Sequence, residues 1–167
     1  PGARLPESLN ATTEIEVALA AAEVIVLAVP AQTLRANLLN WKAFFPTNKP
    51  VISSLKGIEI QSNLRMSEVV RDCIAMSDSL VGIITGPNLA SELVLRQPAG
   101  AVGASTNPEI SKLIARLFNT KYFRVYTSDD LENPFLQTNR FRYKKHLSYG
   151  NGKSAVRVNN NMQWVGP

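Results

Sequence analysis

Residues 24–33 read Val-Ile-Val-Leu-Ala-Val-Pro-Ala-Gln-Thr, and this stretch decides the fold class. Its six leading apolar residues are far fewer than the roughly 20 that cross a bilayer, and they are typical of a strand buried on both faces. Pro30 ends the strand, since proline cannot donate a backbone hydrogen bond. Residues 33–45 then carry an apolar side chain at helical spacing, which predicts a helix packed on that strand.

The same alternation continues along the chain. Further short apolar strands are expected at residues 51–55, 80–85, 99–104 and 123–126. Helices are expected at residues 14–22, 64–76, 88–96 and 108–118. Strands that alternate with amphipathic helices indicate βαβ units and therefore an α/β fold with a mainly parallel sheet.

Composition excludes several classes of protein. A chain of 167 residues with 45% hydrophobic residues is long and apolar enough for one globular domain. Cys73 is the single cysteine and His146 the single histidine, so neither a disulfide framework nor a Cys- or His-based metal centre is expected. We expect no membrane span and no metal, and a reducing cytoplasm is the default location.

Charge divides the chain into two segments. The net charge of +5 comes entirely from residues 132–167, which hold six basic residues against Glu132 as the single acid. This segment shows no apolar periodicity and is rich in Asn, Arg, Lys and Gln. We therefore expect an ordered domain over residues 1–131 and a basic, irregular tail over residues 132–167.

Three expected strand ends carry distinctive residues, and ligands of doubly wound sheets bind beyond such ends. Pro30 fixes the backbone where a flat dinucleotide could lie, although an apolar strand ending in proline can also be plain architecture. Lys56 follows the second strand, where its ammonium could hold a phosphate or polarise an alkoxide, or could be an ordinary solvated lysine. Gly57 would let the backbone approach a ligand.

The third strand end reads Gly86-Pro87-Asn88, with Asn88 expected as the N-cap of the next helix. Free amides at a helix start suit an anion, although an ordinary capped helix would read the same way.

Taken in succession, these motifs resemble the NAD(P)-dependent glycerol-3-phosphate dehydrogenases. Ala-Val-Pro at 28–30, Lys-Gly-Ile-Glu at 56–59 and Gly-Pro-Asn-Leu-Ala-x-Glu at 86–92 occur in the order and approximate spacing of that family. Residues 66–69 and 123–130 resemble its intervening helix and its next strand. The resemblance covers about residues 1–131 and implies the second half of a Rossmann-like doubly wound, mainly parallel sheet, incomplete at its N-terminus.

The resemblance also implies an oxidoreductase of glycerophospholipid metabolism that interconverts sn-glycerol 3-phosphate and dihydroxyacetone phosphate with NAD or NADP. Its implied cofactor contacts are Pro30, Thr33, Lys56 and Ala90. Its implied substrate contacts are Lys56, Gly86 and Asn88. A homodimer is expected for the whole protein.

Two family motifs are absent from this sequence: the Gly-x-Gly-x-x-Gly turn that holds the pyrophosphate, and the Leu-Lys-Asn motif whose lysine transfers a proton. We therefore assign no catalytic residue and expect the 167-residue chain to be inactive by itself. The acid or arginine that separates NAD from NADP precedes Pro1 in the family pattern, so both cofactors stay open.

Several interpretations of the tail compete. It can be the product of a shifted reading frame or a mis-joined gene, or a solvated terminus without a role. It can also be a basic arm in which Arg140, Arg142, Lys144 and Lys145 meet nucleic-acid phosphates. On that last interpretation the chain is a non-catalytic remnant or binding module. A further alternative is a nicotinamide-dependent dehydrogenase that has the same fold but acts on a different substrate.

Overall fold

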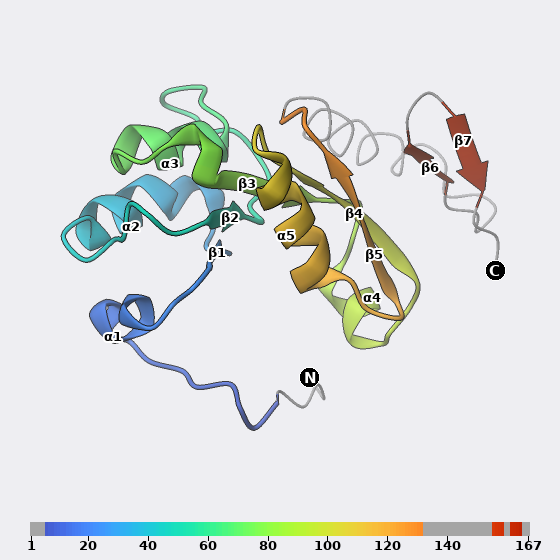
Figure 1. Ribbon diagram of the computed structural model, residues 1–167, viewed down its shortest axis with the longest axis horizontal. Coiled ribbons are helices and arrows are strands. Elements are labelled where there is room, and N and C mark those ends of the chain that lie inside the picture. The colour runs from blue at the N-terminus through green and yellow to red at the C-terminus, as the bar shows by residue number, and fades with distance from the viewer. Residues whose placement is uncertain (1–5, 132–154, 159–160, 165–167) are drawn as a thin grey trace.

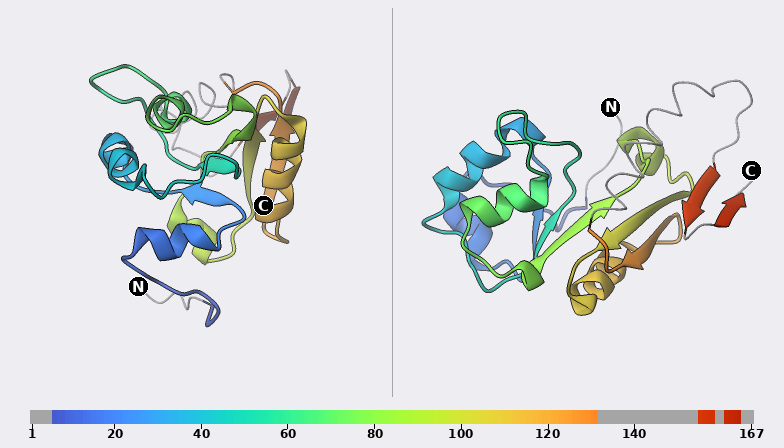
Figure 2. Two further views of the ribbon diagram at one scale, coloured as in Figure 1. Left: turned by 60° about the vertical axis from the view of Figure 1, so that its left-hand side comes forward. Right: turned by 90° about the horizontal axis from the view of Figure 1, so that it is seen from above.

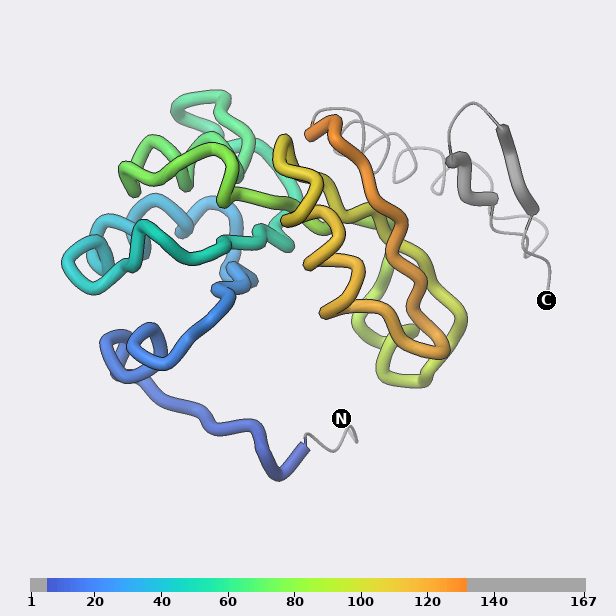
Figure 3. The backbone as a smooth tube through the Cα atoms, in the orientation of Figure 1, coloured from blue at the N-terminus to red at the C-terminus, as the bar shows by residue number. Residues whose placement is uncertain are grey.

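The computed structural model describes residues 6–131, 155–158 and 161–164 (Figure 1). The helices of the main body are α1 (Ile15–Ala20), α2 (Leu34–Trp41), α3 (Met66–Cys73), α4 (Ala90–Val94) and α5 (Pro108–Phe118), with 3₁₀ turns η1 (Ala31–Thr33) and η2 (Asp78–Leu80). The strands are β1 (Ile25–Leu27), β2 (Val51–Ser53), β3 (Val81–Thr85), β4 (Ala99–Ala104) and β5 (Phe123–Ser128). Residues 6–14 are exposed and run apart from the sheet before α1, as the backbone trace in Figure 3 shows.

The five strands form one sheet in the order β1-β2-β3-β4-β5. Neighbouring strands are parallel at β1–β2, β2–β3 and β4–β5, and antiparallel at β3–β4, where Ile83 lies opposite Ala104. The expected mainly parallel α/β sheet is therefore confirmed. The antiparallel step was not predicted, because apolar strand patterns carry no information on strand direction.

Helices cover both faces of the sheet, and two hydrophobic cores result. One core joins α1, α2 and α3 to Ile25, Leu27, Val51 and Val81. The other joins α5 to Ile52, Ile84 and Val125. Consecutive strand residues point to opposite faces, so Val51 and Ile52 enter different cores. The left view of Figure 2 shows α2 and α5 on opposite sides of the sheet.

Helix α5 approaches the sheet closely because glycine lies beneath it. A Cβ atom on Gly82 would be 2.7 Å from Ile114 Cδ1, and one on Gly103 would be 2.6 Å from Ile114 Cγ2. Ile114 is fully buried between them. These two glycines therefore set the distance between helix and sheet.

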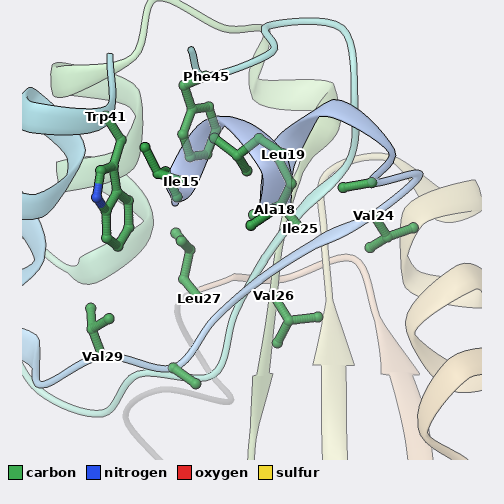
Figure 4. A pocket seen from close by; sticks show the side chains of 12 residues that line it. Ile15, Ala18, Leu19, Val24, Ile25, Val26, Leu27, Val29, Trp41 and Phe45 are labelled. Atoms are coloured by element: carbon green, nitrogen blue, oxygen red, sulfur yellow. The ribbon is translucent and has the colours of Figure 1, made fainter. Parts of the chain in front are cut away.

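The expectation that β1 is buried on both faces is wrong. Among the described residues it pairs with β2 alone, and Val26 on it is 45% exposed. An apolar cavity of about 270 Å³ lies beside it, lined among others by Leu19, Val26 and Trp41 (Figure 4). The sequence does not predict this exposure, because an apolar run cannot tell a central strand from an edge strand.

The tail is described at two short strands, β6 (Ala155–Val158) and β7 (Asn161–Trp164), which pair antiparallel. This corrects the expectation of an irregular segment for those residues, where β-branched Val156 and Val158 alternate along the chain as in a strand. The basic run at 140–145 lies outside the described residues. In the described part of the chain, no helix has the length and hydropathy of a membrane span.

Candidate functional site

The predicted site residues follow β1, β2 and β3, whose carboxyl ends meet at one edge of the sheet because the three strands are parallel. The loop after β1 contains Pro30 and η1, and the loop after β2 contains Lys56 and Gly57. The loop after β3 contains Gly86 and Asn88 and leads into α4. Contacts between side chains and backbone join all three.

Lys56 links the second loop to the third. Its Nζ atom donates hydrogen bonds to the carbonyl oxygens of Gly86 at 2.8 Å and Asn88 at 3.4 Å. Lys56 itself is exposed, so the contact places a cation at the surface where two strand ends meet. The structure thus brings together Lys56, Gly86 and Asn88, the three residues predicted to contact the substrate.

Two glycines are required here for different reasons. Gly57 has φ +119°, a backbone conformation that residues with a Cβ atom rarely adopt. Gly86 is buried, and a Cβ atom on it would lie 2.6 Å from the Gly100 carbonyl oxygen and 2.5 Å from Asn88 Nδ2. Gly86 therefore lets the third loop lie directly against β4.

The start of α4 differs from the expectation. Leu89, not Asn88, is the N-cap residue, and no side chain caps the helix. The helix has five residues, too few for a strong dipole at its N-terminus. Asn88 instead supplies its carbonyl oxygen to Lys56, and Ala90 is the exposed first residue of the helix.

Pro30 and Thr33 lie in the first loop. Thr33 Oγ1 donates to the Pro30 carbonyl oxygen at 2.9 Å and accepts from Asn37 Nδ2 at 3.3 Å. Both Pro30 and Thr33 are exposed. They reach the second loop through Gln32, whose Nε2 donates to the Ile58 carbonyl oxygen at 2.8 Å.

A charged cluster beside the site was missed in the sequence. Arg35 on α2 holds Glu59 with two parallel hydrogen bonds, Nε to Oε1 at 3.0 Å and Nη2 to Oε2 at 2.9 Å. Its Nη1 also contacts Asp72 on α3 at 2.5 Å. The bonds from Arg35 and one from the Ser62 hydroxyl lower the pKa of Glu59, while Glu59 and Asp72 raise the pKa of Arg35. The available signal was Glu59 within the quoted Lys-Gly-Ile-Glu motif.

Arg65 is the N-cap of α3. Glu68 supplies one half of a capping box there, because its carboxylate accepts from the Arg65 backbone N–H at 2.8 Å, whereas the Arg65 side chain has no acceptor for the other half. The Ser62 hydroxyl is bonded to Glu59. The loop after β2 is therefore longer and more strongly tied down than the sequence indicated.

Among the residues that the structure describes, no group of three or more His, Cys, Asp or Glu side chains is placed to hold a metal ion. Cys73 is a free thiol buried between α2 and α3, and burial raises its pKa. A buried thiol with a raised pKa is a poor nucleophile, so Cys73 has a packing role.

A mainly parallel sheet covered by helices on both faces, with loops converging at its carboxyl edge, defines the class of nucleotide-binding α/β domains. The family described as "NAD-dependent glycerol-3-phosphate dehydrogenase N-terminus" matches residues 1–111. This chain belongs to that family.

Curated relatives agree with the assignment. A glycerol-3-phosphate dehydrogenase [NAD(P)+] of Streptomyces avermitilis is 44% identical over 131 residues, covering 78% of this chain and 39% of the relative. One of Corynebacterium urealyticum is 42% identical over 127 residues, covering 76% of this chain and 38% of the relative. The chain thus spans less than two fifths of the length of these relatives. They are dehydrogenases, so the alternative of a nucleic-acid-binding module gains no support from them.

Solved structures agree on the fold. The crystal structure of glycerol-3-phosphate dehydrogenase from Coxiella burnetii matches with a TM-score of 0.72 at 26% identity, over 78% of this chain and 39% of that one. The Saccharomyces cerevisiae enzyme matches with a TM-score of 0.70 at 23% identity, over the same shares of the two chains. The Rossmann-like architecture expected from the sequence is confirmed.

Proposed function

We propose that this chain is part of the nucleotide-binding domain of an enzyme that interconverts sn-glycerol 3-phosphate and dihydroxyacetone phosphate with NAD or NADP. The observation that carries the proposal is the hydrogen bond from Lys56 Nζ to the Gly86 carbonyl oxygen. It places a cation where two strand ends of a nucleotide-binding sheet meet, and family membership supplies the reaction class.

The surface beyond β1 and β2 suits a dinucleotide. Two small residues face each other there, because Gly57 has no side chain and its nearest neighbour is Ala31 Cβ, 3.9 Å from where a Gly57 Cβ atom would lie. We propose that exposed Pro30, Thr33 and Ala90 border the cofactor and that Lys56 lies at its junction with the substrate. When bound, the nicotinamide carries the hydride, and the protein orients the reactants.

Lys56 has the chemistry that the substrate needs. Its ammonium can hold the phosphate of dihydroxyacetone phosphate or stabilise the negative charge that develops on the C2 oxygen as hydride arrives. We propose Gly86 and Asn88 as further substrate contacts, since both lie within reach of that ammonium. No residue of this chain is assigned the proton transfer, because the family's Leu-Lys-Asn motif is absent from it.

Two broader features belong to the same proposal. The nucleotide-binding domain would end near residue 131, where the family resemblance and the neutral charge balance both end. The protein would act in the cytoplasm, in keeping with its free, buried Cys73. The whole protein would act as a homodimer.

The test uses the protein expressed from its complete gene. Purified protein should oxidise NADH or NADPH when dihydroxyacetone phosphate is added, and its rate should depend on the phosphate group. Turnover of a non-phosphorylated keto acid, with none of dihydroxyacetone phosphate, would refute the proposed substrate.

A further inference from the structure

The loop after β2 is held to the protein by a carboxylate that the proposed reaction does not use. Glu59 is 7% exposed, although its neighbours Ile58 and Ile60 are 44% and 77% exposed. Burial removes water from a carboxylate, so the folded loop depends on protein groups that replace that water. Arg35 and Ser62 provide those groups.

Arg35 fixes where Glu59 can lie. A guanidinium meets a carboxylate in a planar, two-bond arrangement, which defines orientation as well as distance. Arg35 belongs to α2 and also contacts Asp72 on α3, so both helices determine its position. The bonded unit therefore ties the exposed loop to the rigid core between the two helices.

The short connection from Glu59 to Lys56 is also fixed. Gln32 binds both sides of Glu59, donating to the Ile58 carbonyl oxygen at 2.8 Å and accepting from the Ile60 N–H at 3.1 Å. Gly57 separates Ile58 from Lys56 in the sequence and has a φ of +119°. The backbone at Lys56 is thus held on its C-terminal side by the bonds to Glu59.

We propose that Arg35 and Glu59 are positioning residues that hold Lys56 against the Gly86 carbonyl, an inference that rests on the proposed function of Lys56. A lysine side chain is flexible, so its ammonium stays in one place only if its backbone does. Glu59→Gln removes the carboxylate that Arg35 binds in the loop, while the contact of Arg35 with Asp72 remains, so the loop is freed from α2 and α3. Lys56 then spends less time at Gly86.

A double-mutant cycle separates positioning from general damage. In the protein expressed from its complete gene, Glu59→Gln should lower kcat/KM for dihydroxyacetone phosphate by about 10- to 100-fold, the scale of a misplaced reacting group. In a Lys56→Met background, the same substitution should change kcat/KM by less than about twofold, because the group that it positions is gone. An equal loss in both backgrounds would overturn the inference.

A second measurement needs no activity. Competitive acetylation with trace acetic anhydride, read by peptide mass spectrometry on the same protein, reports the exposure of each lysine amine. Lys56 should react several-fold faster in Glu59→Gln than in the unsubstituted protein. Glu109→Gln removes an exposed carboxylate, bonded to Lys112 on α5 and outside the loop after β2, and should leave Lys56 unchanged.

The outcomes distinguish the two proposals. If the unsubstituted protein does not turn over dihydroxyacetone phosphate, the proposed function fails, and the acetylation rates still decide whether Glu59 positions Lys56. If the protein turns over dihydroxyacetone phosphate but Lys56 is acetylated at the same rate in all variants, the positioning inference fails and the proposed function stands. If Glu59→Gln folds poorly, Arg35→Lys takes its place. It keeps a cation but loses the planar guanidinium, so we expect an intermediate effect on both kcat/KM and the acetylation rate of Lys56.

Discussion

The Nζ atom of Lys56 lies 2.8 Å from the carbonyl oxygen of Gly86, across a sequence separation of 30 residues. This contact joins the loop after β2 to the loop after β3 at the carboxyl edge of the sheet. It makes the position of the ammonium depend on both loops.

Replacing Lys56 by alanine in the protein expressed from its complete gene should cost about 2–4 kcal/mol of transition-state stabilisation, the scale of losing one positioned donor. The measurement is kcat/KM for dihydroxyacetone phosphate. Lys49→Ala is the matched control, because Lys49 is bonded to the Ala20 carbonyl oxygen, away from the site. Unchanged kcat/KM for Lys56→Ala would mean that Lys56 is an ordinary solvated lysine.

Gly86→Ala should lower the free energy of unfolding by about 1–3 kcal/mol, because the added methyl group meets the backbone of β4. Urea unfolding followed by circular dichroism measures the change. Gly100→Ala serves as the control, since its Cβ atom would be 3.6 Å from the nearest atom, the Arg124 carbonyl oxygen. Equal losses in the two variants would show that close packing is not the reason for Gly86.

Stability should fall in acid through Glu59. Its pKa is lowered in the folded protein by Arg35, so the folded state favours the ionised carboxylate more than the unfolded state does. The resulting stabilisation is present above the unfolded pKa of about 4.3 and is lost as pH falls through the lower folded value. Urea unfolding at several pH values should show Glu59→Gln as less stable at neutral pH, with the difference shrinking in acid. A difference that is constant with pH would contradict the ion-pair explanation.

The edge of β1 should promote self-association of the 167-residue chain. Val26 is 45% exposed beside an apolar cavity, and exposed apolar edge strands pair with one another. Val26→Lys should therefore shift sedimentation towards the monomer at the same concentration. Val17→Lys alters a more exposed apolar residue, which belongs to α1 and not to the strand. If that control has the same effect, general hydrophobicity and not the edge causes the association.

The 167-residue chain alone should bind NADH weakly and show no measurable turnover. Its sequence lacks both the glycine-rich turn for the pyrophosphate and the Leu-Lys-Asn lysine, whose loss costs about 10²–10⁴ in rate. Fluorescence titration with NADH and a turnover assay with dihydroxyacetone phosphate test this. Micromolar binding together with turnover would show that both motifs are dispensable.

The strands and helices were largely predictable because each has its own period. The run at 24–29 and the helical spacing over 33–45 predicted β1 and α2, although both elements are shorter than predicted, at Ile25–Leu27 and Leu34–Trp41. Strand direction and strand position were not predictable in this way. The antiparallel pairing of β4 and the exposed side of Val26 depend on which elements lie nearby, and a local pattern does not contain that information.

The candidate site was predictable where a residue follows a strand directly. Lys56 and Gly86 occupy such positions, and the structure brings them together. The partnership of Arg35 with Glu59 was not predictable, because the two residues lie 24 positions apart and each alone reads as a surface charge. Only the packing of α2 against the loop after β2 makes them partners.

Strand β2 also constrains how this protein can change over evolution. Val51 packs in the core beneath α2 and α3, and Ile52 packs in the core beneath α5. Gaining or losing one residue before Val51 would slide the strand by one position and exchange the two sets of side chains between the cores. Length changes in the surface segment at 46–49 would be tolerated only if the loop absorbs them without moving β2. We therefore expect natural variants to replace Val51 and Ile52 by other apolar residues while preserving their alignment with β1 and β3.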